Sequence, residues 1–212
     1  MVVFDLDGTL LDSVPDLHRC LNNVLVAEGF GPVSLGRVRS FVGDGARALV
    51  DRTVNAVGAP ESAAADILER FLASYGDAPC LLGRPYAGAR DALAHAKRIG
   101  PVSLCTNKPT APTLRILDDL GWAQTFDRVV CGDTCTTRKP APEMIEAAVA
   151  GLAHITDVIM VGDSQPDEDA ARRAGCRFIW ASYGYGKAND PLAADGVVAE
   201  LAILPELLTV LA

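Results

Sequence analysis

The chain has 212 residues, of which 50% are apolar, so it can bury a substantial core, either as one large domain or as a core with a smaller lid. Its formal net charge of −8 at pH 7 excludes the broad basic surface that nucleic acids require, and we expect no DNA or RNA partner. No apolar run approaches the roughly 20 residues of a membrane span, and no basic segment precedes a cleavable apolar one at the N-terminus. We therefore expect a cytoplasmic protein without a membrane partner.

The first apolar run, at residues 2–4, is typical of a strand buried on both faces, and Asp5, Asp7 and Gly8 follow it. Side chains two residues apart on a strand point to the same side, so Asp5 and Asp7 lie together where the glycine ends the strand. Open parallel α/β sheets bind ligands beyond the carboxyl ends of their strands, and this pair therefore predicts a functional site. The alternative, an acidic turn at a strand end, leaves two charges without a partner, which is costly.

A helical segment follows this strand. Pro15 and Asp16 suit the first turn of a helix, and apolar residues then repeat at helical spacing from Leu17 to Leu25, before Gly29. Gly and Pro separate further helical patterns at 34–41, 46–57 and 61–75. Residues 15–82 therefore predict an all-helical cap domain, inserted above the carboxyl end of the first strand.

Strands and helices alternate in the remaining chain. Strands are predicted at 101–105, 128–130, 157–161, 177–180 and 196–198, and helices at 87–98, 110–120, 142–150, 167–174 and 201–211. This alternation is typical of a doubly wound parallel sheet, a Rossmann-like α/β core. We expect residues 1–14 and 83–212 to form that core.

Polar residues follow the later strands. Thr106 and Asn107 precede a helix whose N-terminal N–H groups favour an anion, although the two residues suit helix capping equally well. Lys139 precedes a helix that is entered through prolines, and an ordinary surface lysine is the alternative there. Asp163 and Asp167 lie at a strand-to-helix turn, where either can be a cap.

Six cysteines are scattered through the chain, and without a secretory signal we expect free thiols. Cys131 and Cys135 lie four residues apart, but no second Cys or His pair accompanies them as a structural metal site would require.

Together the charged positions resemble the four motifs of the haloacid dehalogenase-like hydrolase superfamily, and the resemblance covers the whole chain, helical cap included. The chain is more narrowly similar to the phosphoglycolate phosphatase branch at residues 5–13 (DLDGTLLDS), 42–45 (VGDG), 106–108 (TNK), 139–140 (KP) and 162–164 (GDS) with Asp167, and more weakly at 183–186 (YGYG). Two features depart from the branch: the first strand is short, and Pro166 stands where asparagine is common. Neither departure removes a group that the chemistry requires.

The carboxylates of this resemblance imply a metal. Four carboxylates converging in one crevice repel one another, so a divalent cation must balance them, and oxygen ligands with room for water and phosphate suit Mg²⁺. The resemblance implies that Asp5 and Asp163 bind Mg²⁺ directly and that the backbone carbonyl of Asp7 is a third ligand. Asp167 is expected to act through water or by orienting the direct ligands.

The resemblance also implies phosphomonoester hydrolysis. Asp5 is expected to attack phosphorus and form an aspartyl-phosphate, while Asp7 protonates the leaving alkoxide and later deprotonates the hydrolytic water. Thr106, the backbone of Asn107 and Lys139 are expected to hold the phosphoryl oxygens.

A small phosphorylated metabolite such as 2-phosphoglycolate is the expected substrate. Cap closure would bring Gly43 and Arg47 towards its non-phosphate end, because glycine lets backbone N–H groups approach an anion and arginine offers a planar fork for a carboxylate. The alternative places Arg47 on the solvent face of its helix.

Two other functions stay open. A β-phosphoglucomutase-like phosphotransferase would share the core motifs and differ in the cap. A non-catalytic phosphate-binding regulatory protein would keep the fold, although the complete set of charged groups speaks against it. A haloacid dehalogenase is disfavoured because its chemistry needs no acid/base residue such as Asp7. We expect a monomer or a weak homodimer.

Overall fold

A six-stranded, fully parallel sheet forms the centre of the computed structural model, which describes residues 1–211. The strand order is β5-β4-β1-β6-β7-β8. Their bounds are β1 (Val2–Phe4), β4 (Val102–Cys105), β5 (Arg128–Val130), β6 (Ile159–Gly162), β7 (Arg177–Ala181) and β8 (Gly196–Val198). The chain passes from β1 to one side of the sheet and returns to its other side at β6, so the order reverses at β1. This reversal opens a crevice at the carboxyl end of β1.

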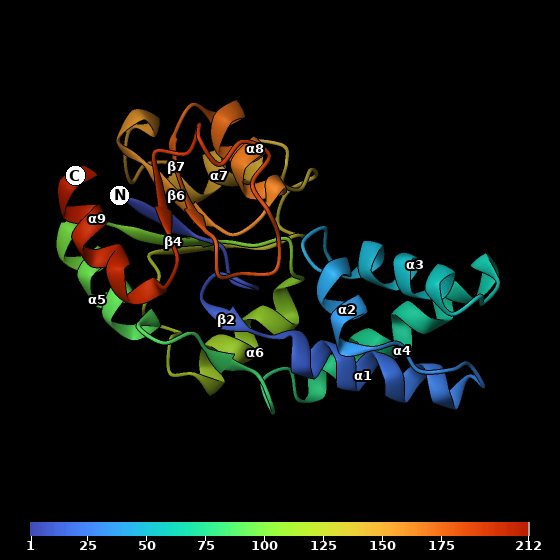
Figure 1. Ribbon diagram of the computed structural model, residues 1–212. Helices are drawn as coiled ribbons and strands as arrows, with labels where there is room; N and C mark the ends of the chain where they lie inside the picture. The colour runs from blue at the N-terminus through green and yellow to red at the C-terminus, as the bar shows by residue number, and fades with distance from the viewer. Residues whose placement is uncertain (212) are drawn as a thin grey trace.

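Helices cover both faces of the sheet (Figure 1). One face packs on α5 (Ala89–Ile99), α6 (Thr110–Asp119) and α9 (Leu204–Leu211), and the other on α7 (Glu143–Val149) and α8 (Gln165–Ala174). Side chains of β1 alternate between these two apolar clusters: Val2 and Phe4 enter the first, and Val3 the second. The predicted α/β core with a doubly wound parallel sheet is confirmed.

The inserted helices lie to one side of this core (Figure 1). They are α1 (Val14–Ala27), α2 (Leu35–Phe41), α3 (Ala46–Ala56) and α4 (Ala64–Asp77), the last preceded by a 3-10 turn at Glu61–Ala63. Their apolar faces pack around a cluster of their own, which includes Leu21, Val50 and Phe71. This cluster is separate from the two that flank the sheet, and the division into a cap of residues 15–82 and a core stays a prediction. Ala212, the last residue of that expected core, lies outside the described residues.

Sequence periodicity predicted most elements to within a few residues, and the differences have local causes. The strand predicted at 157–161 begins only at Ile159, because residues Ile155–Asp157 form a 3-10 turn. The helix predicted at 167–174 begins at Gln165, because Ser164 and Asp167 form a capping box there. The last predicted helix is a 3-10 turn, Leu201–Ile203, followed by α9.

None of the described helices is both long enough and apolar enough to cross a lipid bilayer. All six cysteines carry free thiols, as the sequence predicted.

The cap joins the core through a small antiparallel sheet that the sequence did not predict. Its strands are β2 (Leu11–Asp12) and β3 (Arg84–Pro85). Beside it, the fully buried carboxylate of Asp16 accepts hydrogen bonds from the backbone N–H groups of Leu82 (2.9 Å) and Gly83 (2.7 Å) and pairs with Arg19 at 3.1 Å. The Asp16 carboxylate therefore holds the two segments that connect cap and core next to each other.

Replacing this carboxylate should destabilise the protein. Asp16→Ala leaves two backbone N–H groups without their charged acceptor, and we expect the free energy of unfolding to fall by about 3 kcal/mol. Urea denaturation at neutral pH measures the change. Asp51→Ala is the control, because Asp51 pairs with Arg47 on the surface of α3 and such pairs contribute only about 0.5 kcal/mol. Equal effects of the two variants would contradict the role assigned to Asp16.

Candidate active site

Three carboxylates meet at the carboxyl end of the central strands. Asp5 follows β1, Asp163 follows β6 and Asp167 lies in the first turn of α8. All three are buried, and each has an oxygen within 4.8 Å of an oxygen of the other two. Three of the four carboxylates expected at the site therefore come together as the sequence predicted, because parallel strands end at the same edge of the sheet.

Backbone groups and small side chains orient two of these acids. Asp163 Oδ2 accepts hydrogen bonds from the N–H groups of Tyr185 (2.7 Å) and Gly186 (3.0 Å). Asp167 Oδ2 accepts from both the N–H (3.1 Å) and the hydroxyl (2.6 Å) of Ser164. These contacts hold the carboxylates in place without balancing their charge.

Glycines let two loops approach Asp163 closely. Gly8 has φ +88°, and a Cβ atom there would lie 2.4 Å from Asp163 Oδ2. At Gly184 a Cβ atom would lie 2.3 Å from the Cβ of Asp163. The loops after β1 and β7 thus need glycine where they enclose the acid.

A buried ammonium binds two of the acids. Lys139 Nζ donates to Asp5 Oδ1 (2.9 Å), Asp167 Oδ1 (2.6 Å) and the backbone carbonyl of Cys105 (2.7 Å), which uses all three of its N–H donors. Burial lowers the pKa of Lys139, but the charges of Asp167 and Asp5 outweigh it, and the pKa is raised. Lys139 therefore stays charged and is no surface lysine.

One ammonium does not balance three carboxylates. Burial, reinforced by Asp167 and opposed by Lys139, raises the pKa of Asp5 from 3.8 to about 7. Burial and the charges of Asp167 and Asp5 raise the pKa of Asp163 from 3.8 to about 8. Buried carboxylates with excess negative charge and oxygen donors only are the chemistry that a hard divalent cation such as Mg²⁺ requires, so these residues fit a metal.

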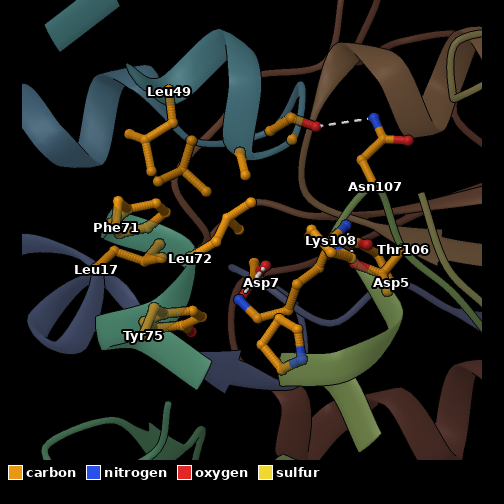
Figure 2. A pocket seen from close by; sticks show the side chains of 16 residues that line it. Asp5, Asp7, Leu17, Leu49, Phe71, Leu72, Tyr75, Thr106, Asn107 and Lys108 are labelled. Atoms are coloured by element: carbon orange, nitrogen blue, oxygen red, sulfur yellow. Dashed lines mark hydrogen bonds and ion pairs between the residues drawn. The ribbon is translucent and has the colours of Figure 1, made fainter. Parts of the chain in front are cut away.

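A second ion pair lies beside the first. Lys108 Nζ donates to both carboxylate oxygens of Asp7, at 2.9 and 3.0 Å (Figure 2). The Ser13 hydroxyl also donates to Asp7. The Asp7 side chain is thus held apart from the cluster of three acids. Lys108 thus lines the pocket although the sequence did not single it out, and its position directly after Thr106 and Asn107 was the available signal.

The expected phosphate ligands surround the same crevice. Thr106 is buried and lines a pocket with Asp5 and Asp7. The Asn107 side chain donates to the carbonyls of Gly43 (3.0 Å) and Lys139 (2.9 Å) and accepts from the Lys139 N–H at 3.0 Å. The Asn107 side chain therefore connects the cap loop that contains Gly43 with the core loop that contains Lys139.

The structure does not bring Arg47 to this pocket. Its side chain is exposed, and its Nε donates to Asp51, one turn further along α3, at 2.8 Å. The apolar side of α3 packs on the apolar cluster of the cap, and Arg47 lies on the side of the helix that faces the solvent. Of the two alternatives for Arg47, the structure agrees with the one on the solvent face of its helix and not with the one at the substrate, whereas Gly43 does line the pocket.

The pocket lies between cap and core and has two unlike sides (Figure 2). Asp5, Thr106 and Asn107 lie on the core side. The cap side is formed by apolar residues and one tyrosine, namely Leu17, Leu49, Phe71, Leu72 and Tyr75. Its cavity volume is about 40 Å³. Such a pocket accepts a small ligand.

Comparison with known proteins places these residues in context. Residues 1–175 match the model of the haloacid dehalogenase-like hydrolase family. A phosphoglycolate phosphatase from Cereibacter sphaeroides is 40% identical over 98% of this chain and 96% of its own length. A phosphoglycolate phosphatase from Rhodospirillum rubrum is 39% identical over 93% of this chain and 85% of its own.

Solved structures agree with these sequences. The crystal structure of a predicted phosphoglycolate phosphatase from Haemophilus somnus superimposes with a TM-score of 0.90 at 30% identity, covering 98% of this chain and 97% of that one. CbbY from Rhodobacter sphaeroides, solved in complex with phosphate, has a TM-score of 0.76 at 23% identity, covering 96% and 95%, and shows a likeness of fold alone.

The raised pKa values predict how a divalent cation should bind. Asp5 and Asp163 carry protons below about pH 7 and 8 and compete with the cation there, so Mg²⁺ affinity should fall at least about tenfold between pH 8.5 and pH 6. Isothermal titration calorimetry measures it. Affinity that does not change over this range would show that these carboxyls are not ligands.

Stability should change with pH in the same window. Both carboxyls bind protons more readily in the folded chain than in the unfolded one, where their ordinary pKa is 3.8. In the metal-free protein these two groups should therefore add most to the free energy of unfolding below about pH 4. This added stability should be lost as the pH rises to about 8. Thermal melting with and without Mg²⁺ tests the sign: the cation should raise Tm more at pH 8.5 than at pH 6.

Proposed function

Because this chain belongs to the haloacid dehalogenase-like hydrolase family and is a phosphatase, we propose that it hydrolyses a short phosphorylated carboxylic acid such as 2-phosphoglycolate with Mg²⁺ as cofactor. The observation that carries the proposal is the buried cluster of Asp5, Asp163 and Asp167, of which Asp5 also lines a small pocket together with Asp7. The names of the relatives support the substrate, since two of them at about 40% identity are phosphoglycolate phosphatases.

The proposed metal site uses the acids already described. Asp5 and Asp163 bind Mg²⁺ through their carboxylates, and the backbone carbonyl of Asp7 is a third ligand. Asp167, held by Ser164 and Lys139, orients the direct ligands. When bound, the cation neutralises charge on the phosphoryl oxygens and on Asp5.

The proposed reaction has two steps. In the first, a carboxylate oxygen of Asp5 bonds to phosphorus while the bond from phosphorus to the ester oxygen breaks, and Asp7 gives its proton to that oxygen. In the second, Asp7 takes a proton from a water molecule whose oxygen attacks phosphorus, which releases phosphate and restores Asp5. Lys139, 2.9 Å from Asp5, offsets charge on the phosphoryl group together with Thr106 and the backbone of Asn107.

The pocket supports a small substrate over a sugar phosphate. Apolar side chains such as Leu17, Leu49 and Phe71 line its cap side, and they offer no partners for the several hydroxyl groups of a sugar. A β-phosphoglucomutase-like transfer is for that reason the weaker proposal. A cytoplasmic location and a monomeric or weakly dimeric state stay predictions from the sequence.

Two carboxylate-to-amide variants should fail at different steps. Asp5→Asn removes the nucleophile, so rapid quenching with labelled substrate should detect no phosphoenzyme. Asp7→Asn removes only the proton donor, so it should still bind Mg²⁺ and orthophosphate while its kcat falls by about 10²-fold or more. Calorimetry and phosphate release from p-nitrophenyl phosphate, with and without Mg²⁺, complete the comparison.

The outcomes separate the candidate functions. Equal loss of Mg²⁺ affinity in both variants would contradict the different roles given to Asp5 and Asp7. Release of phosphate by the unmodified protein that depends on Mg²⁺ would support Mg²⁺ as the cofactor. Binding of orthophosphate without turnover of any phosphate ester would favour the phosphate-binding regulatory protein.

A further inference from the structure

One end of the pocket holds a cation and a hydroxyl that the proposed reaction does not use. Lys108 is 5% exposed and Tyr75 is 2% exposed, and both line the pocket. The hydroxyl of Tyr75 has no hydrogen-bond partner within residues 1–211. A buried polar group without a partner is costly, so it indicates a ligand that supplies one.

Lys108 also has a donor to spare. An ammonium group has three N–H donors, and the two oxygens of Asp7 accept from Nζ at 2.9 and 3.0 Å. Among the described residues, Asp7 supplies the two oxygens that accept from Nζ with hydrogen-bond geometry. The ammonium instead lies 4.7 Å from the centre of the Tyr75 ring, and Figure 2 shows the two side chains next to each other. One N–H of Lys108 and the O–H of Tyr75 are therefore available at one place.

The surroundings define the chemistry of a ligand there. Lys108 is the single positively charged side chain among the described residues that line the pocket. The neighbouring wall of the cap is apolar, with Leu17, Phe71 and Leu72. Two donors, one of them charged, beside an apolar wall suit a single small anionic group with two acceptor oxygens, which is a carboxylate.

We propose that Lys108 and Tyr75 form the subsite for the carboxylate of the substrate, with Lys108 Nζ and Tyr75 Oη each donating one hydrogen bond to it. This proposal rests on the proposed function and makes its substrate class specific. Asp7, which faces the leaving oxygen, lies 2.9 Å from Lys108 Nζ, so the carboxylate must be only one or two bonds away from the carbon that carries that oxygen. Tyr75 belongs to α4 of the cap and Lys108 to the core, so the subsite is complete only when the two are closed together.

Binding of two matched phosphonates tests the subsite without turnover. 3-Phosphonopropionate is 2-phosphoglycolate with a methylene group in place of the ester oxygen, and propylphosphonate carries a methyl group where the carboxylate would be. In the presence of Mg²⁺, calorimetry should show that the protein binds 3-phosphonopropionate at least about tenfold more tightly, a difference of about 1.4 kcal/mol. Lys108→Met and Tyr75→Phe should each reduce that preference, and the double variant should remove it.

Two controls keep the test specific. Tyr75→Phe removes a hydroxyl that has no hydrogen-bond partner among residues 1–211, so it should leave Tm unchanged, whereas Lys108→Met also removes the partner of Asp7. Lys97→Met replaces an exposed lysine that pairs with Asp127 outside the pocket and should leave the preference intact. In turnover, the two pocket variants should lower kcat/KM for 2-phosphoglycolate by about tenfold more than for ethyl phosphate, which lacks the carboxylate.

The results distinguish this subsite from the proposed function. No preference for 3-phosphonopropionate in the unmodified protein would overturn the subsite, as would equal losses of kcat/KM on both esters in both pocket variants. A clear preference for 3-phosphonopropionate that depends on Lys108 and Tyr75, together with faster turnover of another short phosphorylated acid than of 2-phosphoglycolate, would support the subsite and contradict the named substrate.

Discussion

The ammonium group of Lys139 is the interaction on which the arrangement of the site depends. It joins Asp5 and Asp167 within a cluster of three buried carboxylates. Two like charges 4 Å apart cost about 4 kcal/mol at an effective dielectric of 20, which is a large part of the 5–15 kcal/mol that typically stabilises a folded domain. Burial, together with the charges of the neighbouring acids, still raises the pKa of both Asp5 and Asp163, so the lysine offsets only part of the cost of the cluster. The same excess of negative charge makes the cluster suitable for a divalent cation.

The fold assembles this cluster from distant parts of the chain with little freedom of position. β1 pairs with β4 on one side and β6 on the other, so the residues that follow these strands meet at one edge. Backbone N–H groups of Tyr185 and Gly186 then hold Asp163, and Ser164 holds Asp167. Side chains fixed in this way need little reorganisation when charge develops on a substrate.

Two separate lysines divide the site into two parts. Lys139 pairs with Asp5 and Asp167 in the acidic cluster, and Lys108 pairs with Asp7 beside Tyr75 of the cap. Asn107 connects these parts, because its side chain contacts both the backbone of Lys139 and the cap loop at Gly43. The position of the cap is therefore linked to the groups of the core through defined hydrogen bonds, and the carboxylate of Asp16 adds two more where the chain connects cap and core.

The sequence by itself predicted the α/β core and the helical insertion, because strands and helices alternate at recognisable spacing. Asp5 and Asp7 stood out as two acids after a buried strand, whereas Thr106, Lys139, Asp163 and Asp167 were expected at the site through the resemblance of their motifs to the haloacid dehalogenase-like hydrolases. The sequence did not determine the cap side of the pocket. Helical periodicity shows which residues share a face but not which other element covers that face, so Arg47 was expected at the substrate and lies instead beside Asp51 in solvent. Tyr75, Lys108 and the small sheet of β2 and β3 came only from the tertiary structure. Their roles depend on contacts between residues that chain order leaves far apart, and only the packing of cap against core brings those residues together.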